Sequence, residues 1–229
     1  MVGGAHAVVL ALADATGSGA TLVMPTHSGA LSEPSHWRNP PVPEAWWEPI
    51  RQGTPAYDPV LTPTRHMGVI VECFRHLQGV LRSAHPSASF AARGPAAATI
   101  VGDHHLDSAL GEGSPLARIY DLDGWILLLG VGHGKNTSLH LAEHRARFPA
   151  KQWVTQGAPV LVDGNRQWTT YRDLEGRADD FNALGADFAA AGGERRGPVG
   201  AGGGLLVRQR AIVDFAVTWM EAHRRESQP

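Results

Sequence analysis

A strand–loop–helix junction between Trp125 and Arg145 places the strongest constraint on the fold of this chain. The apolar run Trp125–Leu129 is typical of a buried strand, and a glycine-rich loop follows it. Residues 136–138, which are Asn, Thr and Ser, then predict the start of a helix. A strand that leads through a glycine loop into a helix is typical of α/β proteins, which bind their ligands at such strand ends.

Two side chains of the predicted helix are suited to proton transfer. His140 and Glu143 are three positions apart, so they share one helix face. Histidine titrates near neutral pH, and a neighbouring carboxylate can hold its tautomer and favour its cation. The backbone N–H groups of residues 132–137 are suited to stabilise an oxyanion or bind a phosphate. The junction therefore indicates either a general base or a structural histidine packed in one helix turn.

Helices and strands alternate along the rest of the chain, which predicts an α/β layered fold. The long segment 26–63 is rich in proline and tryptophan, and its length favours a functional loop. The turn at Asp163–Gly164 predicts a hairpin, and the glycine-rich segment 192–204 predicts a linker. The periodicity predicts helices at 4–15, 66–77, 96–101, 111–120 and 205–224, and strands at 21–24, 80–81, 153–162 and 166–171.

Composition argues against several classes of protein. The net charge of −2 gives no electrostatic footprint for nucleic acid. No apolar run approaches the roughly 20 residues that span a bilayer, so no membrane partner is expected. The single cysteine, Cys73, cannot form an internal disulfide, which favours a cytoplasmic location. The twelve histidines lack HExxH or comparable ligand spacing, so we expect no metal.

Other catalytic motifs fail at specific positions. A phosphate-binding P-loop would need glycine at Leu129 and a hydroxyl residue at Asn136. A dinucleotide-binding loop would need its third glycine at Lys135. The sequence contains no G-x-S-x-G elbow. Cys73 has His76 nearby but no third group that would orient it, so covalent catalysis is not favoured.

The string GVGHGKNTSLHLAE at residues 130–143 resembles the signature of the aminoglycoside 3-N-acetyltransferase family. The other blocks that resemble the family are Ala20–Thr26, Pro40–Trp47, Thr62–Gly68, Val80–Pro95, Gly111–Gly124 and Val213–Met220. These blocks occur in the family's order and span essentially the whole chain. Each block alone is weak, but the set is specific.

The resemblance implies a fold and an activity. The expected fold is an α/β, three-layer α/β/α sandwich with a mixed central sheet, as a single antibiotic N-acetyltransferase domain over residues 1–229 that lacks the family's amino-terminal helix and strand. The expected reaction moves acetyl from acetyl-CoA to the 3-amino group of an aminoglycoside, without a metal. The alternatives are a truncated, catalytically weak relative that binds coenzyme A or a polycationic ligand, and an acetyltransferase for a different amine.

The resemblance also implies roles for individual residues. His140 matches the family's TSLH histidine and is the expected general base in a direct transfer, with Glu143 as the local choice for the orienting carboxylate. The residues expected to bind the cosubstrate are Ser83, His85 and Ser89 in the loop that contains the string HPSASF at residues 85–90, here called the HPSASF loop, and Thr137 beside the thioester.

An aminoglycoside is a polycation, so its pocket needs carboxylates that are not already compensated. The candidates for substrate binding are Glu33, Glu44, Asp179 and Asp180. The tryptophans of the long segment either line the sugar rings or pack the segment itself. The expected partners are therefore the aminoglycoside and coenzyme A, with a homodimer as one expected assembly.

Overall fold

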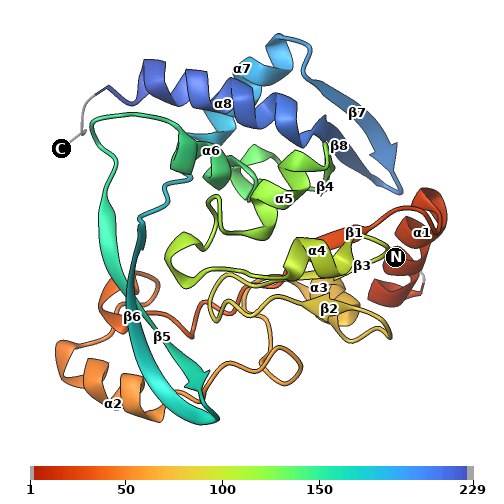
Figure 1. Ribbon diagram of the computed structural model, residues 1–229. Helices are drawn as coiled ribbons and strands as arrows, with labels where there is room; N and C mark the ends of the chain where they lie inside the picture. The colour runs from red at the N-terminus through yellow and green to blue at the C-terminus, as the bar shows by residue number, and fades with distance from the viewer. Residues whose placement is uncertain (1–2, 226–229) are drawn as a thin grey trace. The chain divides into compact units, whose positions relative to one another are not determined.

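The computed structural model describes residues 3–225 and divides the chain into two compact units, each of which mixes helices and strands (Figure 1). The first unit comprises Met1–Ala109 and Val154–Asp173, and the second comprises Leu110–Trp153 and Leu174–Pro229. The α/β class expected from the alternating pattern is therefore confirmed. None of the helices in the described part of the chain has the length and apolar character needed to cross a membrane.

The first unit contains a three-stranded sheet in the order β1–β3–β2, with antiparallel pairing that sets Val23 opposite Ala92. Helices α1 and α3 pack on each other, and Val9, Phe74 and Ala91 form a buried cluster. The elements are α1 (Gly4–Thr16), β1 (Leu22–Pro25), η1 (Pro34–His36), η2 (Glu44–Trp46), α2 (Trp47–Gly53), α3 (Val69–Arg75), β2 (Leu81–Arg82), β3 (Phe90–Arg93), α4 (Ala97–Val101), η3 (Leu106–Ser108), β5 (Trp153–Val162) and β6 (Asn165–Leu174).

A long hairpin, β5–β6, forms a separate two-stranded sheet (Figure 1). Its two connecting residues, Asp163 and Gly164, have φ angles of 49° and 77°. Positive φ at both positions is the requirement of the tight two-residue hairpin turn, and Asp-Gly satisfies it at low steric cost. The hairpin predicted from this dipeptide is confirmed, with the first strand at the expected residues.

The second unit contains another three-stranded antiparallel sheet, in the order β4–β8–β7, in which Leu127 lies opposite Leu206. Helices α6 and α8 pack against each other, and both contribute fully buried apolar side chains such as Leu141 and Ile212. The elements are α5 (Pro115–Asp121), β4 (Trp125–Leu129), η4 (His133–Lys135), α6 (Leu139–Arg145), α7 (Phe181–Ala190), β7 (Glu194–Val199), β8 (Gly202–Arg208) and α8 (Gln209–His223).

Two sequence predictions of local structure were wrong. Segment 192–204 is not a linker, because β7 and β8 form a hairpin there around Gly200, which has a φ of 58°. The predicted helix from Leu205 begins only at Gln209, since residues 205–208 complete β8 against β4. The glycines of β8 gave no strand pattern in the sequence, because the strand is stabilised by pairing with β4 and β7 on its two edges and not by its own side chains.

The predicted loop around HPSASF also hides a strand. Residues Phe90–Arg93 form β3, which pairs with both β1 and β2 at the centre of the sheet. Ala91 and Ala92 are fully buried. Alanine has low strand propensity, so only its position between two neighbours identifies this segment as a strand.

Candidate active site

The loop between β4 and α6 sets the start of the α6 helix. Asn136 Oδ1 accepts a hydrogen bond from the Ser138 backbone N–H at 3.2 Å, and the Asn136 carbonyl accepts from Leu139 N at 3.1 Å. The side chain of Ser138, the N-cap residue, makes no capping bond. The helix start predicted from residues 136–138 is confirmed, and the asparagine supplies the side-chain acceptor that the free N–H groups need.

His140 and Glu143 lie on one face of α6 and are bonded to each other. His140 Nδ1 lies 2.5 Å from Glu143 Oε2. Glu143 is buried, whereas 20% of the His140 side chain is exposed. A carboxylate accepts only, so the proton of a neutral ring resides on Nδ1 and leaves Nε2 as the basic nitrogen. The pair therefore presents a partly exposed imidazole whose neutral tautomer is set by its bond to the carboxylate.

The other oxygen of Glu143 is also fully engaged. Oε1 accepts from Arg224 Nη1 at 2.6 Å and from the Arg177 backbone N–H at 2.9 Å. The Arg224 guanidinium in turn bonds both oxygens of Asp180. Gly176 approaches the pair so closely that a Cβ added there would lie 3.0 Å from His140 Nδ1. Sequence patterns did not identify Arg224, Arg177 or Gly176, which come from segments far from α6 in sequence.

The backbone N–H groups of the glycine loop are less available than expected. The Gly134 N–H donates to Asn182 Oδ1 at 2.8 Å, and the N–H groups of Lys135 and Asn136 donate to loop carbonyls. Three of the donors predicted for an oxyanion are thus occupied within the protein. A hydrogen bond also holds this loop, because His133 Nε2 lies 2.8 Å from Glu194 Oε2. The glycine-rich appearance of the loop gave no sign of this internal bonding.

The three residues expected from the HPSASF loop to bind the cosubstrate lie in the first unit. Ser83, His85 and Ser89 are each at most 1% exposed. Burial lowers the pKa of His85 to about 4, so its ring is neutral at physiological pH.

The polar side-chain atoms of this loop are bonded inside the unit. His85 Nδ1 accepts from Ala88 N, and its Nε2 donates to the Leu106 carbonyl. Ser83 Oγ bonds His104 Nδ1, and Ser89 Oγ donates to the Thr26 carbonyl. These side chains therefore shape the loop that carries them. Thr137, the fourth candidate, lies in the second unit, where it is partly exposed and its carbonyl accepts from His140 N at 3.1 Å.

The four carboxylates expected to bind a polycation differ in their surroundings. Glu33 is bonded by Arg51 through two nitrogens, at 2.6 and 3.2 Å, and although burial opposes the change, these bonds lower the pKa of Glu33. Glu44 is exposed at the start of η2. Asp179 pairs with Arg177 at 3.0 Å, and Asp180 pairs with Arg224 at 2.6 Å. Three of the four negative charges are thus already compensated by arginine.

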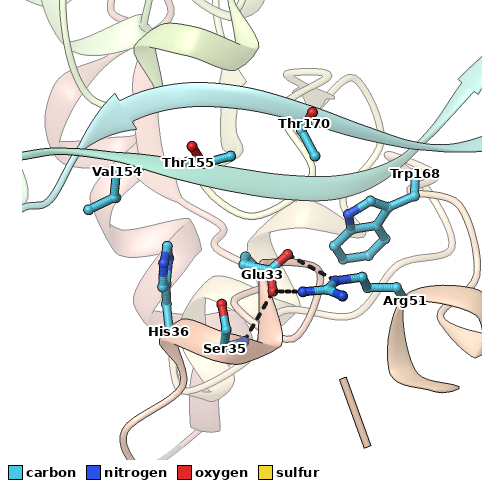
Figure 2. A pocket seen from close by; sticks show the side chains of 8 residues that line it. All are labelled: Glu33, Ser35, His36, Arg51, Val154, Thr155, Trp168 and Thr170. Carbon is cyan, nitrogen blue, oxygen red and sulfur yellow. Dashed lines mark hydrogen bonds and ion pairs between the residues drawn. The ribbon is translucent and has the colours of Figure 1, made fainter. Parts of the chain in front are cut away.

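Glu33 lines a cavity of about 520 Å³ in the first unit, shown in Figure 2. The Glu33–Arg51 pair lies on one side, and the β5–β6 hairpin contributes Thr155, Trp168 and Thr170. Trp168 Nε1 is buried without a hydrogen-bond partner among residues 3–225. Hydroxyls, an indole and the Glu33–Arg51 pair thus line one hollow.

Within this α/β fold, a buried carboxylate bonds a partly exposed histidine, which is the pairing of residue types that general-base catalysis uses. The sequence matches the family described as "Aminoglycoside 3-N-acetyltransferase" over residues 1–221, and the chain belongs to this family. It is 44% identical to the SPbeta prophage-derived aminoglycoside N(3')-acetyltransferase-like protein YokD of Bacillus subtilis, over 95% of this chain and 79% of that protein. It is 39% identical to aminoglycoside N(3)-acetyltransferase VII of Streptomyces paromomycinus, over 96% and 81%.

Solved structures show the same similarity. The crystal structure of YokD from Bacillus subtilis has a TM-score of 0.92 and 42% identity, over 96% of this chain and 82% of that one. AAC-IIIb in a binary complex with CoASH has a TM-score of 0.85 and 32% identity, over 100% and 87%. AAC-VIa bound to sisomicin has a TM-score of 0.86 and 32% identity, over 99% and 87%. The resemblance stated from the sequence blocks is therefore confirmed.

Proposed function

We propose that this chain transfers the acetyl group of acetyl-CoA to the 3-amino group of an aminoglycoside. The His140–Glu143 pair is the observation that carries the proposal, because it provides a histidine whose side chain is partly exposed and whose Nδ1 is bonded to a buried carboxylate. Membership of the family supports the reaction type. The relatives with CoASH and with sisomicin support the two substrates.

The chemistry follows from the pair. The nitrogen of the 3-amino group attacks the thioester carbonyl while His140 Nε2 takes a proton from that nitrogen. Glu143 stabilises the imidazolium that forms. The tetrahedral intermediate then collapses: the C–N bond is retained, the C–S bond breaks, and the departing thiolate takes the proton from His140. A general base of this kind contributes about 10²–10⁴-fold to the rate.

Binding of the cosubstrate is assigned to the HPSASF loop and to Thr137. The internal bonds of Ser83, His85 and Ser89 support a role in holding the loop backbone in the shape that receives coenzyme A. Thr137 precedes the base by three residues and is partly exposed, which supports its assignment beside the thioester.

Binding of the acceptor is assigned to the carboxylates. Glu44 is the exposed member of the set and attracts a cation without first losing an arginine partner. Glu33 stays anionic beside Arg51 in the hairpin cavity, and Asp179 and Asp180 follow the segment that contacts the base. An amine of the antibiotic would have to share each of these three carboxylates with its arginine.

The larger architecture is also part of the proposal. We assign residues 1–229 to one antibiotic N-acetyltransferase domain with a three-layer α/β/α sandwich around a mixed sheet. The similarity to solved relatives supports a fold in common with them. The strand pairs described in both three-stranded sheets are antiparallel, so the layers and the mixed sheet rest on the family resemblance alone. A cytoplasmic location and a homodimer remain predictions from the sequence; light scattering and an experimental structure with coenzyme A test the assembly and the layers.

The function is tested with purified protein, acetyl-CoA, sisomicin and a thiol reagent that reports released coenzyme A. We expect turnover by the unaltered chain and a loss of about 10²–10⁴-fold in kcat for His140→Gln. His223→Gln, which alters an exposed histidine on α8, serves as the matched control. Near-normal kcat for His140→Gln would remove this histidine from the mechanism, and binding of both ligands without thiol release would contradict the enzyme assignment.

A further inference from the structure

Arg224 links the end of α8 to the carboxylate behind the candidate base. Its side chain is only 10% exposed, and its guanidinium divides its donors between two anions. Nη1 bonds Glu143 Oε1 at 2.6 Å, while Nε and Nη2 bond the two oxygens of Asp180 at 2.7 and 2.6 Å. Nη2 also donates to the Arg177 carbonyl at 3.0 Å. A planar fork used on both sides in this way fixes the relative positions of all its partners.

The bonding of Glu143 is correspondingly split. Oε2 accepts a hydrogen bond from His140 Nδ1. Oε1 accepts hydrogen bonds from Arg224 and from the Arg177 backbone N–H. The carboxylate therefore cannot rotate without breaking charge-assisted bonds on the opposite side. Since the ring of His140 is oriented by Oε2, the orientation of the base depends on an arginine that does not touch it.

We propose that Arg224 is a positioning residue that locks Glu143 against His140 and, by its positive charge, keeps the imidazole free to accept a proton. This proposal rests on the proposed role of His140 as the base. Arg224 also lies beyond residues 1–221, over which the chain matches the family, so the match itself says nothing about this residue.

The charge argument depends on everything that surrounds the ring. The titratable neighbours of the ring on α6 are Glu143 and His144. Phe181, at the start of α7, is uncharged, and its ring centroid lies 5.0 Å from that of His140. The other charged side chains of these segments are Glu175, Arg177, Asp179 and Asp180 in segment 175–180, of which Glu175 is exposed, Arg224 at the end of α8, and Lys151 after α6. Lys151 bonds backbone carbonyls, and Asp179 pairs with Arg177, so the balance at the ring is decided by Glu143, Asp180 and Arg224.

This balance has a definite sign. Glu143 and Asp180 contribute two negative charges and Arg224 contributes one positive charge. Although burial lowers it, the hydrogen bonds to Asp180 and Glu143 raise the pKa of Arg224 above its ordinary value, so the guanidinium stays charged throughout the working pH range. Without Arg224 the two carboxylates would hold the imidazolium more strongly, and the ring would remain protonated, and inactive as a base, to a higher pH.

The test is a pH titration of the His140 ring by NMR, with its signal assigned by its loss in His140→Gln. We expect Arg224→Met to move the midpoint upward by about one pH unit, the scale of one charge removed at short range in a partly screened site. Asp180→Asn alone should move it downward. The double variant restores one net negative charge and should return the midpoint towards that of the unaltered protein.

Arg208→Met is the matched control, because Arg208 pairs with an exposed aspartate, Asp123, away from the base. It should leave the titration unchanged. In the thiol-release assay, Arg224→Met should lose most activity below the shifted midpoint and recover at higher pH, and Arg224→Lys should recover part of the loss by restoring the charge.

Two results would overturn the proposal: an Arg224→Met midpoint equal to or below that of the Arg208→Met protein, or an equal fall in kcat at every pH. Should Arg224→Met fail to fold, Asp180→Asn still decides the question, because a midpoint that does not move downward refutes the charge balance. The titration does not require turnover. A protein that shows the shift without acetylating an aminoglycoside would therefore reject the proposed function while supporting the linkage.

Discussion

Replacement of Glu143 by glutamine tests the candidate base most directly. Glutamine has nearly the same shape, and its amide oxygen can still accept from Arg224 and from the Arg177 N–H. The amide nitrogen then faces His140 Nδ1, where it donates instead of accepting. The variant therefore removes the charge that stabilises the imidazolium and reverses the tautomer, so that the proton of the neutral ring moves to Nε2.

The magnitude can be worked from the single bond that is lost. A hydrogen bond to a charged group contributes about 1.5–3 kcal/mol. If this bond forms fully only when the ring is protonated, its loss lowers kcat by about 10- to 150-fold. The reversed tautomer adds to this loss, and the corresponding exchange in a Ser–His–Asp triad lowers kcat by about 10⁴-fold. We therefore expect at least a tenfold fall in kcat for Glu143→Gln.

The assay is thiol release at saturating acetyl-CoA and aminoglycoside, so that kcat is separated from KM. Glu112→Gln is the matched control, because Glu112 is an exposed carboxylate that bonds Arg145, which lies on α6 like Glu143. Folding is checked by thermal unfolding, since Arg224 would keep a neutral partner at Glu143 and some stability should be lost. A folded Glu143→Gln protein with kcat within threefold of the control would refute the assignment of this carboxylate.

Two further variants test the second unit, which carries His140, and the first unit, which carries His85. Gly176→Ala would place a Cβ 3.0 Å from His140 Nδ1, so we expect lower kcat with little change in the KM for acetyl-CoA; unchanged kcat would show that the ring tolerates the contact. Burial lowers the pKa of His85 from 6.5 to about 4, so the unfolded chain binds the extra proton between these values. The contribution of His85 to stability is therefore fully present above pH 6.5, and about 3 kcal/mol of it is lost as the pH drops to 4. Urea unfolding at pH 7 and pH 5 measures the first part of this loss, about 2 kcal/mol. His85→Asn should flatten the difference between the two pH values, and an equally steep fall in the variant would assign the pH dependence to other groups.

Much of the local structure around the site could be predicted because it depends on near neighbours. The spacing of His140 and Glu143 is enough to place them on one helix face, whatever the helix packs against. The Asp163–Gly164 turn likewise follows from the conformations that these two residues favour. The strand of residues 125–129 was evident from its continuous apolar run.

The errors fall where stability comes from distant partners. Segment 202–208 contains three consecutive glycines, yet it is the central strand of its sheet because β4 and β7 pair on its two edges. The carboxylates Glu33, Asp179 and Asp180 were expected to be free for a cation, but each has an arginine partner. Pattern analysis counts charges along the chain and does not show which of them are neutralised in space.

The amino-acid sequence by itself determined the family of this protein, its α/β class and the helix that carries a histidine and a glutamate on one face. Only the tertiary structure decided how that glutamate is held, because Arg224 reaches Glu143 across 81 positions of sequence. It also decided that the polar groups of the HPSASF loop turn inward to bond the unit that carries them. The physical reason is that helix phase and turn conformation depend on adjacent residues, whereas charge compensation and burial depend on segments that meet only when the chain folds.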